Sequence, residues 1–361
     1  MIRRDFLLKS GLLGCTLLIP PISSSCKRAT DEVTGQFYTP LRRRVMMAML
    51  SMQRQNWEHG IASQAFVEIG DQEMMVLMAK EAAVRLGADG RLAVLGTAYG
   101  INDSATPLEA VLRSADILDD HELRSAAERT ITYLFKDAPR TDEGYIHHSY
   151  HGPELWADTL YMGPPFIAYA GYPGEAYRQA KGIIDRIWIQ EESLFASRWN
   201  ADTRQITHPN FWGLGNAHAI SGMTKLIEHL PGTMKRESDI LKNYVRSHLT
   251  GCLRYMRNDY LFHNIINDPS TFVETSLAMR IADSIFKGVE AGWLDRDYLD
   301  TASNMRNAIY GKVNEFGYVT GVPGPPAYSL PARSSEGQAF FLMMEASFDS
   351  LDAEQTKLIP S

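Results

Sequence analysis

Apolar residues recur three and four positions apart along most of the chain after residue 36, with charged residues between them. The segments LRRRVMMAMLSMQ, EMMVLMAKEAAVRL and ESDILKNYVRSHLTGCLRYM show this pattern most clearly. Such spacing places the apolar side chains on one face of a helix. We therefore predict twelve helices, over residues 37–54, 57–69, 72–87, 103–118, 121–136, 159–170, 173–190, 216–229, 236–257, 272–288, 296–313 and 335–348. Strand patterns are scarce, and FGYVTGVPG is the one candidate for a short hairpin.

The connections between these helices alternate between short and long. Short links, such as GD, LDD and GYP, follow the even-numbered helices, and the long links cover residues 88–102, 137–158, 191–215, 258–271 and 314–334. Twelve helices joined in this way form six hairpins. We predict that the hairpins close into an all-α (α/α)6 barrel, a single domain over residues 37–350, with the even-numbered helices inside and the long loops at one mouth. Because no exact repeat is visible, an open helical solenoid is the alternative.

The first 26 residues have the features of an export signal. A basic start, MIRRDFLLKS, precedes a short apolar stretch and then SSSC, which ends at Cys26. These features predict an exported protein, periplasmic or in the outer membrane, with a lipid anchor through Cys26; RRDFLLK also resembles a twin-arginine signal. With Cys26 as the anchor, Cys252 is the only thiol left in the mature chain, so no disulfide is expected. The net charge of −7 argues against nucleic acid as a partner.

Aromatic, histidine and carboxylate residues are concentrated in the long loops, just before the even-numbered helices. Loops of this length in a compact domain are usually functional. If the barrel closes, they bring these residues to one mouth, where aromatic faces and polar groups suit a sugar. The candidate site residues are Trp57, His59, Asp103, His147, Trp156, Asp158, His208, Trp212, Asn216, His218 and Arg333.

The stretch ELWADTLYMGPP places Asp158 among apolar side chains, where a charge is costly unless it is paired, solvated or used. Pro164 and Pro165 fit the first turn of a helix, so Asp158 should lie in the turn above it, facing the mouth. Simpler interpretations remain open: Asp103 could cap a helix, and Glu154 with Asp158 could be a solvated pair. No metal is expected, because the histidines lack ligand spacing. No nucleotide cofactor is expected either, because GLGNAHA follows no strand.

ELWADTLYMGPPFIAYAGY is similar to a signature of glycoside hydrolase families 88 and 105, the unsaturated glucuronyl and rhamnogalacturonyl hydrolases. INDSATP, WGLGNAHAISGMTKLIEHLP, FVETSLAMRIADSIFKGVEAGWL and SSEGQAFFLMMEA resemble further family segments in the same order. The resemblance implies an (α/α)6 barrel without a cofactor. It also implies Asp158 as general acid and base, Asp103 as the assisting carboxylate, and His147 as a substrate contact. Three family positions differ: an arginine is replaced by Leu214, a tryptophan by His218, and a histidine by Ser197 in LFASRWN.

The implied substrate is an oligosaccharide whose terminal uronic acid carries a C4=C5 double bond. Apolar neighbours and an ionised Asp103 should raise the pKa of Asp158 and keep it protonated enough to donate to C4. Arg198 or Arg333 could bind the uronate carboxylate in place of the missing family arginine. Two alternatives remain: hydrolysis of a saturated terminal glucuronic acid by the same two aspartates, and a glycan-binding barrel without catalysis.

Overall fold

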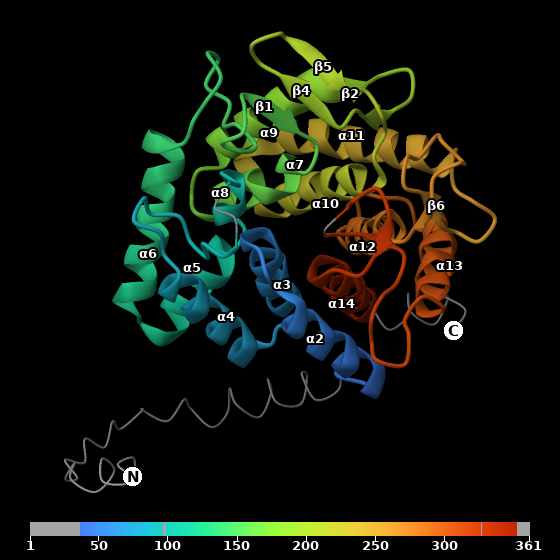
Figure 1. Cartoon of the computed structure of the whole chain (residues 1–361), viewed down its shortest axis with the longest axis horizontal. Coiled ribbons are helices and arrows are strands. Elements are labelled where there is room, and N and C mark those ends of the chain that lie inside the picture. Colours follow the sequence, from blue (N-terminus) through green and yellow to red (C-terminus); the bar gives the residue numbers. More distant parts are fainter. Residues whose placement is uncertain (1–36, 97–98, 326, 352–361) are drawn as a thin grey trace, which may run out of the picture.

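The computed structural model describes residues 37–96, 99–325 and 327–351. Its inner helices form a closed ring (Figure 1), because α14 packs against both α12 and α3, the helix that begins the ring. The predicted all-α barrel is therefore confirmed, and the open solenoid is wrong. The inner helices are α3 (Asn56–Ile69), α5 (Leu108–Leu118), α7 (Thr159–Met162) with α8 (Pro164–Tyr169), α10 (Gly213–His229), α12 (Ser276–Glu290) and α14 (Ser335–Ser350).

An outer helix lies against each part of this ring, as the alternation of links predicts. The outer helices are α2 (Pro40–Met52), α4 (Gln72–Val84), α6 (His121–Thr132), α9 (Pro173–Ile187), α11 (Lys235–Leu253) and α13 (Leu299–Tyr310). Among the described residues, four short helical turns accompany them: η1 (Asn102–Ala105), η2 (Tyr133–Asp137), η3 (Gly232–Met234) and η4 (Arg296–Tyr298). Every predicted helix thus has a counterpart. The predicted export signal and Cys26 lie outside the described residues, within which no helix is long and apolar enough to cross a membrane.

The helix predicted over 159–170 is broken at Gly163, which separates α7 from α8. Pro164 and Pro165 lie in the first turn of α8, as predicted, but α7 already begins just after Asp158. Close packing with α10 fixes this break in place. A Cβ atom at Gly222 of α10 would lie 2.2 Å from the carbonyl oxygen of Leu160, so only glycine allows the two backbones to approach.

Short strands occupy the long connections, which the helical pattern could not reveal. They are β1 (Glu154–Trp156), β2 (Trp188–Ile189), β3 (Leu194–Phe195), β4 (Arg198–Asn200), β5 (Gln205–His208), β6 (Phe262–His263), β7 (Val273–Glu274), β8 (Val322–Pro323) and β9 (Pro331–Ala332). Strands β1, β4 and β5 form an antiparallel sheet, and the other strands pair as β2–β3, β6–β7 and β8–β9. The hairpin expected within FGYVTGVPG is wrong, because β8 pairs with β9 further along the chain.

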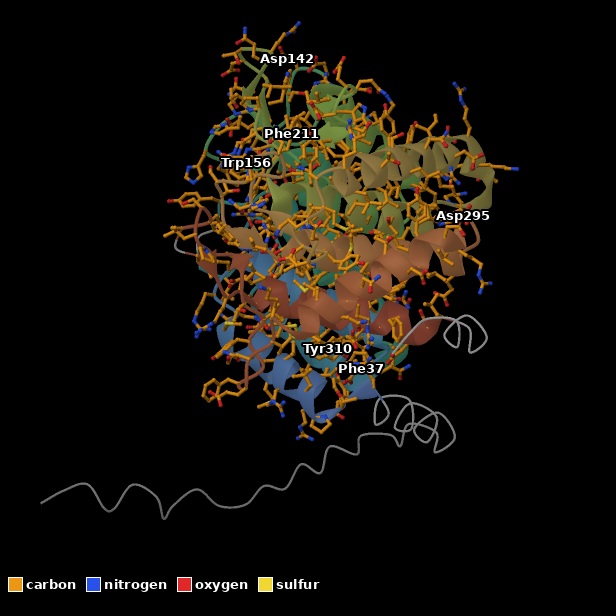
Figure 2. All side chains as sticks on the ribbon, turned by 90° about the vertical axis from the view of Figure 1, so that its right-hand side faces the viewer. Phe37, Asp142, Trp156, Phe211, Asp295 and Tyr310 are labelled. Atoms are coloured by element: carbon orange, nitrogen blue, oxygen red, sulfur yellow. The ribbon has the colours of Figure 1, made fainter. Side chains whose placement is uncertain are left out.

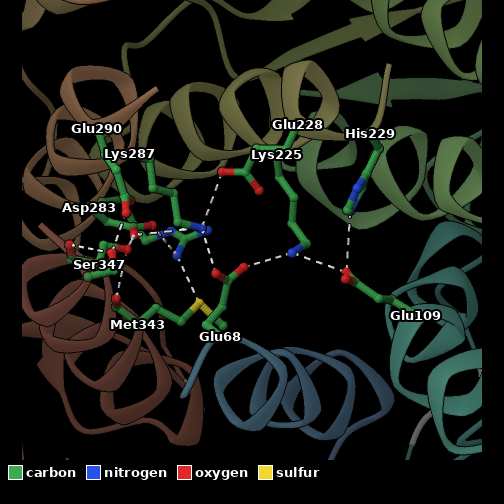
Figure 3. Close-up of polar contacts among 12 residues, drawn as sticks. Glu68, Glu109, Lys225, Glu228, His229, Asp283, Lys287, Glu290, Met343 and Ser347 are labelled. Atoms are coloured by element: carbon green, nitrogen blue, oxygen red, sulfur yellow. Dashed lines mark hydrogen bonds and ion pairs between the residues drawn. The ribbon is translucent and has the colours of Figure 1, made fainter. Parts of the chain in front are cut away.

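The barrel has two distinct ends. Trp156, in a long connection, and Asp295, in the short link after α12, lie on opposite sides of the molecule in Figure 2. Away from the mouth, buried charged residues of α3, α5, α10 and α12 contact one another (Figure 3). There Lys225 lies 2.7 Å from Glu68 and 3.1 Å from Glu109, and Lys287 lies 2.9 Å from Glu68. We call these four residues the closed-end network.

Candidate active site

A cavity of about 540 Å³ opens at the other end, where the inner helices begin. Its lining comes from the long connections, from the end of α7 and from the first two turns of α3, α10 and α14. Seven of the eleven predicted site residues line it: Trp57, Asp103, Trp156, Asp158, His208, Trp212 and His218. The other four do not: His59, His147, Asn216 and Arg333. The two aspartates, which are far apart in the chain, therefore meet in one sugar-sized hollow.

Asp103 lies in η1, and its side chain caps no helix, so the simpler interpretation of this residue is wrong. It is 4% exposed. Gly100 makes room for its carboxylate, because a Cβ atom there would lie 1.7 Å from Oδ2 of Asp103. Burial raises the pKa of Asp103 to about 7, with further contributions from the charges of Asp158 and Glu336, and the Arg91 guanidinium opposes them only in part. Asp103 is therefore a carboxyl group that is partly protonated near neutral pH.

Asp158 follows β1 and immediately precedes α7, so it lies in the turn above the helix, as predicted. It is half-buried and faces the cavity, unlike the more deeply buried Asp103. The sequence predicts a raised pKa at Asp158; in the structure, burial raises the pKa of Asp103 to about 7. The physical reason is depth, because Asp103 has lost nearly all its contact with water.

Trp156 has both of its faces covered. The His148 ring is stacked on it, with the ring centres 4.0 Å apart, and the Arg198 guanidinium carbon lies 3.5 Å from its centre. Two groups this close to one ring centre must lie on opposite faces. The indole N–H also donates to Oε2 of Glu154 at 2.8 Å. A sugar cannot stack on Trp156, so this residue supports the cavity wall, and Trp57, Trp212 and Tyr328 offer the other large aromatic side chains of the lining.

Two of the four residues outside the cavity hold the barrel together. His59 is buried, and its Nε2 lies 2.9 Å from Oε2 of Glu81 on the outer helix α4. Asn216 is also buried, and its amide exchanges hydrogen bonds of 3.0 Å each with the backbone N–H and carbonyl of Phe195. It accepts a further contact from His248 at 2.9 Å. Both residues are therefore structural, which corrects the prediction that they bind substrate.

The other two residues outside the cavity are His147 and Arg333. Their expected places in the lining are taken by His148 and Arg198. The adjacent His148 lines the cavity in place of His147, whose imidazole lies outside it. Burial lowers the pKa of His148, so its ring is neutral near pH 7. Arg333 is exposed and lies over the Tyr318 ring, in a separate surface hollow. Arg198, the other cation that could bind the uronate carboxylate, lines the cavity.

The main residue missing from the predicted site is Glu336, at the start of α14. It is 3% exposed, lines the cavity, and accepts a contact of 2.6 Å from Nε2 of His218 on α10. The sequence places Glu336 with Tyr328 and Arg333 in the loop before the last helix, but it does not distinguish Glu336 from an ordinary first-turn glutamate. Within the described residues, no three His, Cys, Asp or Glu side chains are grouped as a metal site would require.

A closed ring of six helical hairpins with paired carboxyl groups in a cavity at its mouth defines a class of sugar-cleaving barrel. The chain belongs to Glycosyl Hydrolase Family 88, whose sequence profile matches residues 29–330. It is 27% identical over 217 residues to the unsaturated rhamnogalacturonyl hydrolase YesR of Bacillus subtilis. That match covers 56% of this chain and 61% of YesR, so it spans less than two thirds of the curated relative.

Solved structures share the fold over most of the chain. A possible member of the GH105 family from Salmonella enterica matches with a TM-score of 0.76 and 17% identity, covering 94% of this chain and 98% of that one. The unsaturated glucuronyl hydrolase of Bacillus sp. GL1, responsible for glycosaminoglycan degradation, matches with a TM-score of 0.59 and 15% identity, over 83% of this chain and 85% of that one. At these identities the likeness concerns the fold.

Proposed function

We propose that this protein hydrolyses the bond between a terminal unsaturated uronic acid and the next sugar of an oligosaccharide. The observation that carries the proposal is that Asp103 and Asp158 line one cavity and influence each other electrostatically. Family membership and the names of the relatives support the same chemistry. Aromatic side chains around the two carboxyl groups suit the apolar faces of a sugar ring.

The reaction needs one group that gives a proton and one that takes a proton. Protonation at C4 of the vinyl ether leaves positive charge on C5, shared by the ring oxygen. Water then adds at C5 and loses a proton, the ring opens to a ketone, and the resulting hemiacetal releases the next sugar. In this way one water is consumed, and the proton given at C4 is replaced by the proton taken from water.

Asp103 and Asp158 can hold that proton between them. With its pKa raised to about 7, Asp103 keeps a proton at neutral pH, while the less buried Asp158 faces the substrate space. Two carboxyl groups that interact in this way titrate as a pair. In this proposal the pair supplies both the acid and the base. Arg198, which lines the cavity with its Nη1 3.9 Å from Oε2 of Glu154, binds the uronate carboxylate.

The test is turnover of two matched substrates. Oligosaccharides made by a polysaccharide lyase carry the double bond, and intact glucuronide oligosaccharides do not. The proposal predicts loss of ultraviolet absorbance and sugar release from the first set only. The Asp158→Asn variant, checked for folding by circular dichroism, should lose about 10³-fold or more in rate, since both proton transfers depend on the pair. Unchanged turnover in this variant would contradict the site assignment.

A saturated terminal glucuronic acid is the second candidate, because Leu214 and His218 line the cavity where the family signature has arginine and tryptophan. Glucuronic acid released from intact oligosaccharides, with unchanged absorbance from the lyase products, would favour it over the first. Binding of either oligosaccharide without turnover would instead favour a non-catalytic glycan-binding barrel.

A further inference from the structure

Acidic side chains outnumber basic ones in the described lining of the cavity. Asp103, Asp158 and Glu336 contribute carboxyl groups, and Arg198 is the only lysine or arginine among the described lining residues. Glu58 lies close behind: burial raises its pKa, and the charge of Glu336 raises it further. A ligand that enters this cavity therefore finds one strong cation and an excess of acid.

Glu336 is held so that one of its oxygens remains available. Oε1 receives the 2.6 Å contact from His218. The other oxygen accepts no hydrogen bond from the described residues, and it is not among the buried atoms left without a partner, so it is open to the cavity. Glu336 also lies in the first turn of α14, where the helix dipole favours a negative charge. The free oxygen is thus a fixed acceptor on the floor of the site.

An ionised carboxylate accepts hydrogen bonds but donates none. A free ring hydroxyl satisfies it, because the hydroxyl can donate. An O-sulfate at the same position carries negative charge and has no proton to give, so it would meet Glu336 as a like charge with no hydrogen bond. Arg198 belongs to the β4 wall and packs on Trp156, and it can neutralise one acidic group of the substrate.

We propose that Glu336 is a specificity-determining residue, which admits terminal uronic acids with free ring hydroxyls and rejects those that carry a second anionic group such as an O-sulfate. The inference rests on the proposed function, because it assumes a terminal uronic acid in this cavity. Rejection works through repulsion of the wrong ligand, a common route to selectivity.

The experiment compares kcat/KM for two unsaturated disaccharides that differ only in a 2-O-sulfate on the terminal uronic acid. The native protein should prefer the unsulfated one by about 100-fold, since like charges brought together in a desolvated site cost several kcal/mol. Glu336→Gln keeps the size and an acceptor for His218 but removes the charge and adds a donor. It should reduce the preference about tenfold. The matched control is Glu237→Gln, which changes a first-turn glutamate of α11 that lies outside the cavity lining and should leave the preference unchanged.

Binding separates this proposal from the proposed function. In the Asp158→Asn background, dissociation constants for both disaccharides are measured with and without the Glu336→Gln substitution, after a check of thermal unfolding. Selective binding without turnover by the native protein would reject the proposed hydrolysis and keep the selectivity. Turnover or binding of both disaccharides without preference would overturn the role of Glu336. If the Glu336→Gln variant does not fold, the preference measured with Glu336 present still decides.

Discussion

The axis of this barrel holds two groups of buried acids with opposite properties. At the closed end, Glu68 and Glu109 face Lys225, at 2.7 and 3.1 Å (Figure 3). At the mouth, Asp103 and Asp158 line one cavity, and Arg198 is the only lysine or arginine among the described residues that line it. Both groups lie on the inner helices or the loops that precede them, so the same scaffold builds both.

Their pKa values show the difference. Burial alone opposes the ionisation of Glu109, but Lys225 and His229 outweigh it and lower its pKa to about 2. Burial also acts on Asp103, but there the charges of Asp158 and Glu336 add to it, and the pKa rises to about 7. Burial is therefore not what distinguishes a reactive acid from a structural one. The presence or absence of a paired cation decides, and perturbed acids of the second kind are typical of functional sites.

The largest effect is expected from Lys225→Met at the closed end. This change leaves Glu68 and Glu109 buried without their shared cation. Removing one partner of a buried pair costs about 3–5 kcal/mol, so the free energy of unfolding, measured by denaturant titration at pH 7, should fall by that amount. Adding Glu109→Gln to the variant should restore part of the loss. A change below about 0.5 kcal/mol, the usual range for surface substitutions, would show that the network is not structural.

At the mouth we expect the opposite effect on stability: Asp103→Asn should stabilise the protein at neutral pH. Because folding raises the pKa of Asp103, its contribution to stability is greatest in acid and is lost as pH rises through about 7. The variant cannot ionise. Relative to the native protein it should gain about 1–3 kcal/mol between pH 5 and pH 8, somewhat less than the full shift would give at about 1.4 kcal/mol per pKa unit. Unfolding curves at the two pH values measure this. A variant that loses stability more at pH 8 than at pH 5 would contradict the comparison.

A smaller effect is expected from the one cation at the mouth. Arg198→Gln should reduce kcat/KM for uronyl oligosaccharides about 10–100-fold, mainly through KM, because a carboxylate contact holds substrate and transition state alike. Arg333→Gln is the matched control. Arg333 lies in a separate hollow, so this change should alter neither constant more than about twofold, within the range of surface substitutions. A large loss of kcat/KM in Arg333→Gln with little change in Arg198→Gln would show that Arg333, and not Arg198, binds the uronate carboxylate.

Much of the fold follows from the sequence, because amphipathic spacing and link length depend on local residues alone. The meeting of Asp103 and Asp158 was also predictable, since both stand in long loops before inner helices. The direction in which each side chain points from its helix or loop could not be predicted. Trp57 and His59 are two positions apart on α3 and point in different directions, so one lines the cavity and the other contacts α4. The neighbours His147 and His148 divide in the same way in a non-helical segment.

The separate roles of the acidic residues at the mouth could not be predicted from the sequence, for another reason. The raised pKa of Asp103 depends on its depth, and that depth depends on Gly100, whose missing side chain leaves room for the Asp103 carboxylate in the wall. Glu336 resembles an ordinary first-turn residue until α10 brings His218 to it. These features arise from packing between distant segments, which no local pattern encodes.

The most direct test is an infrared pH titration of the carboxyl groups, in which the spectrum of Asp103→Asn is subtracted from that of the native protein. The account predicts a protonated carboxyl band that disappears with a midpoint near pH 7 and whose midpoint falls in Asp158→Asn, where the repelling charge is gone. A midpoint near pH 4, the usual value for an exposed aspartate, in both proteins would mean that Asp103 holds no proton at neutral pH, and the proposed acid–base pair would be wrong.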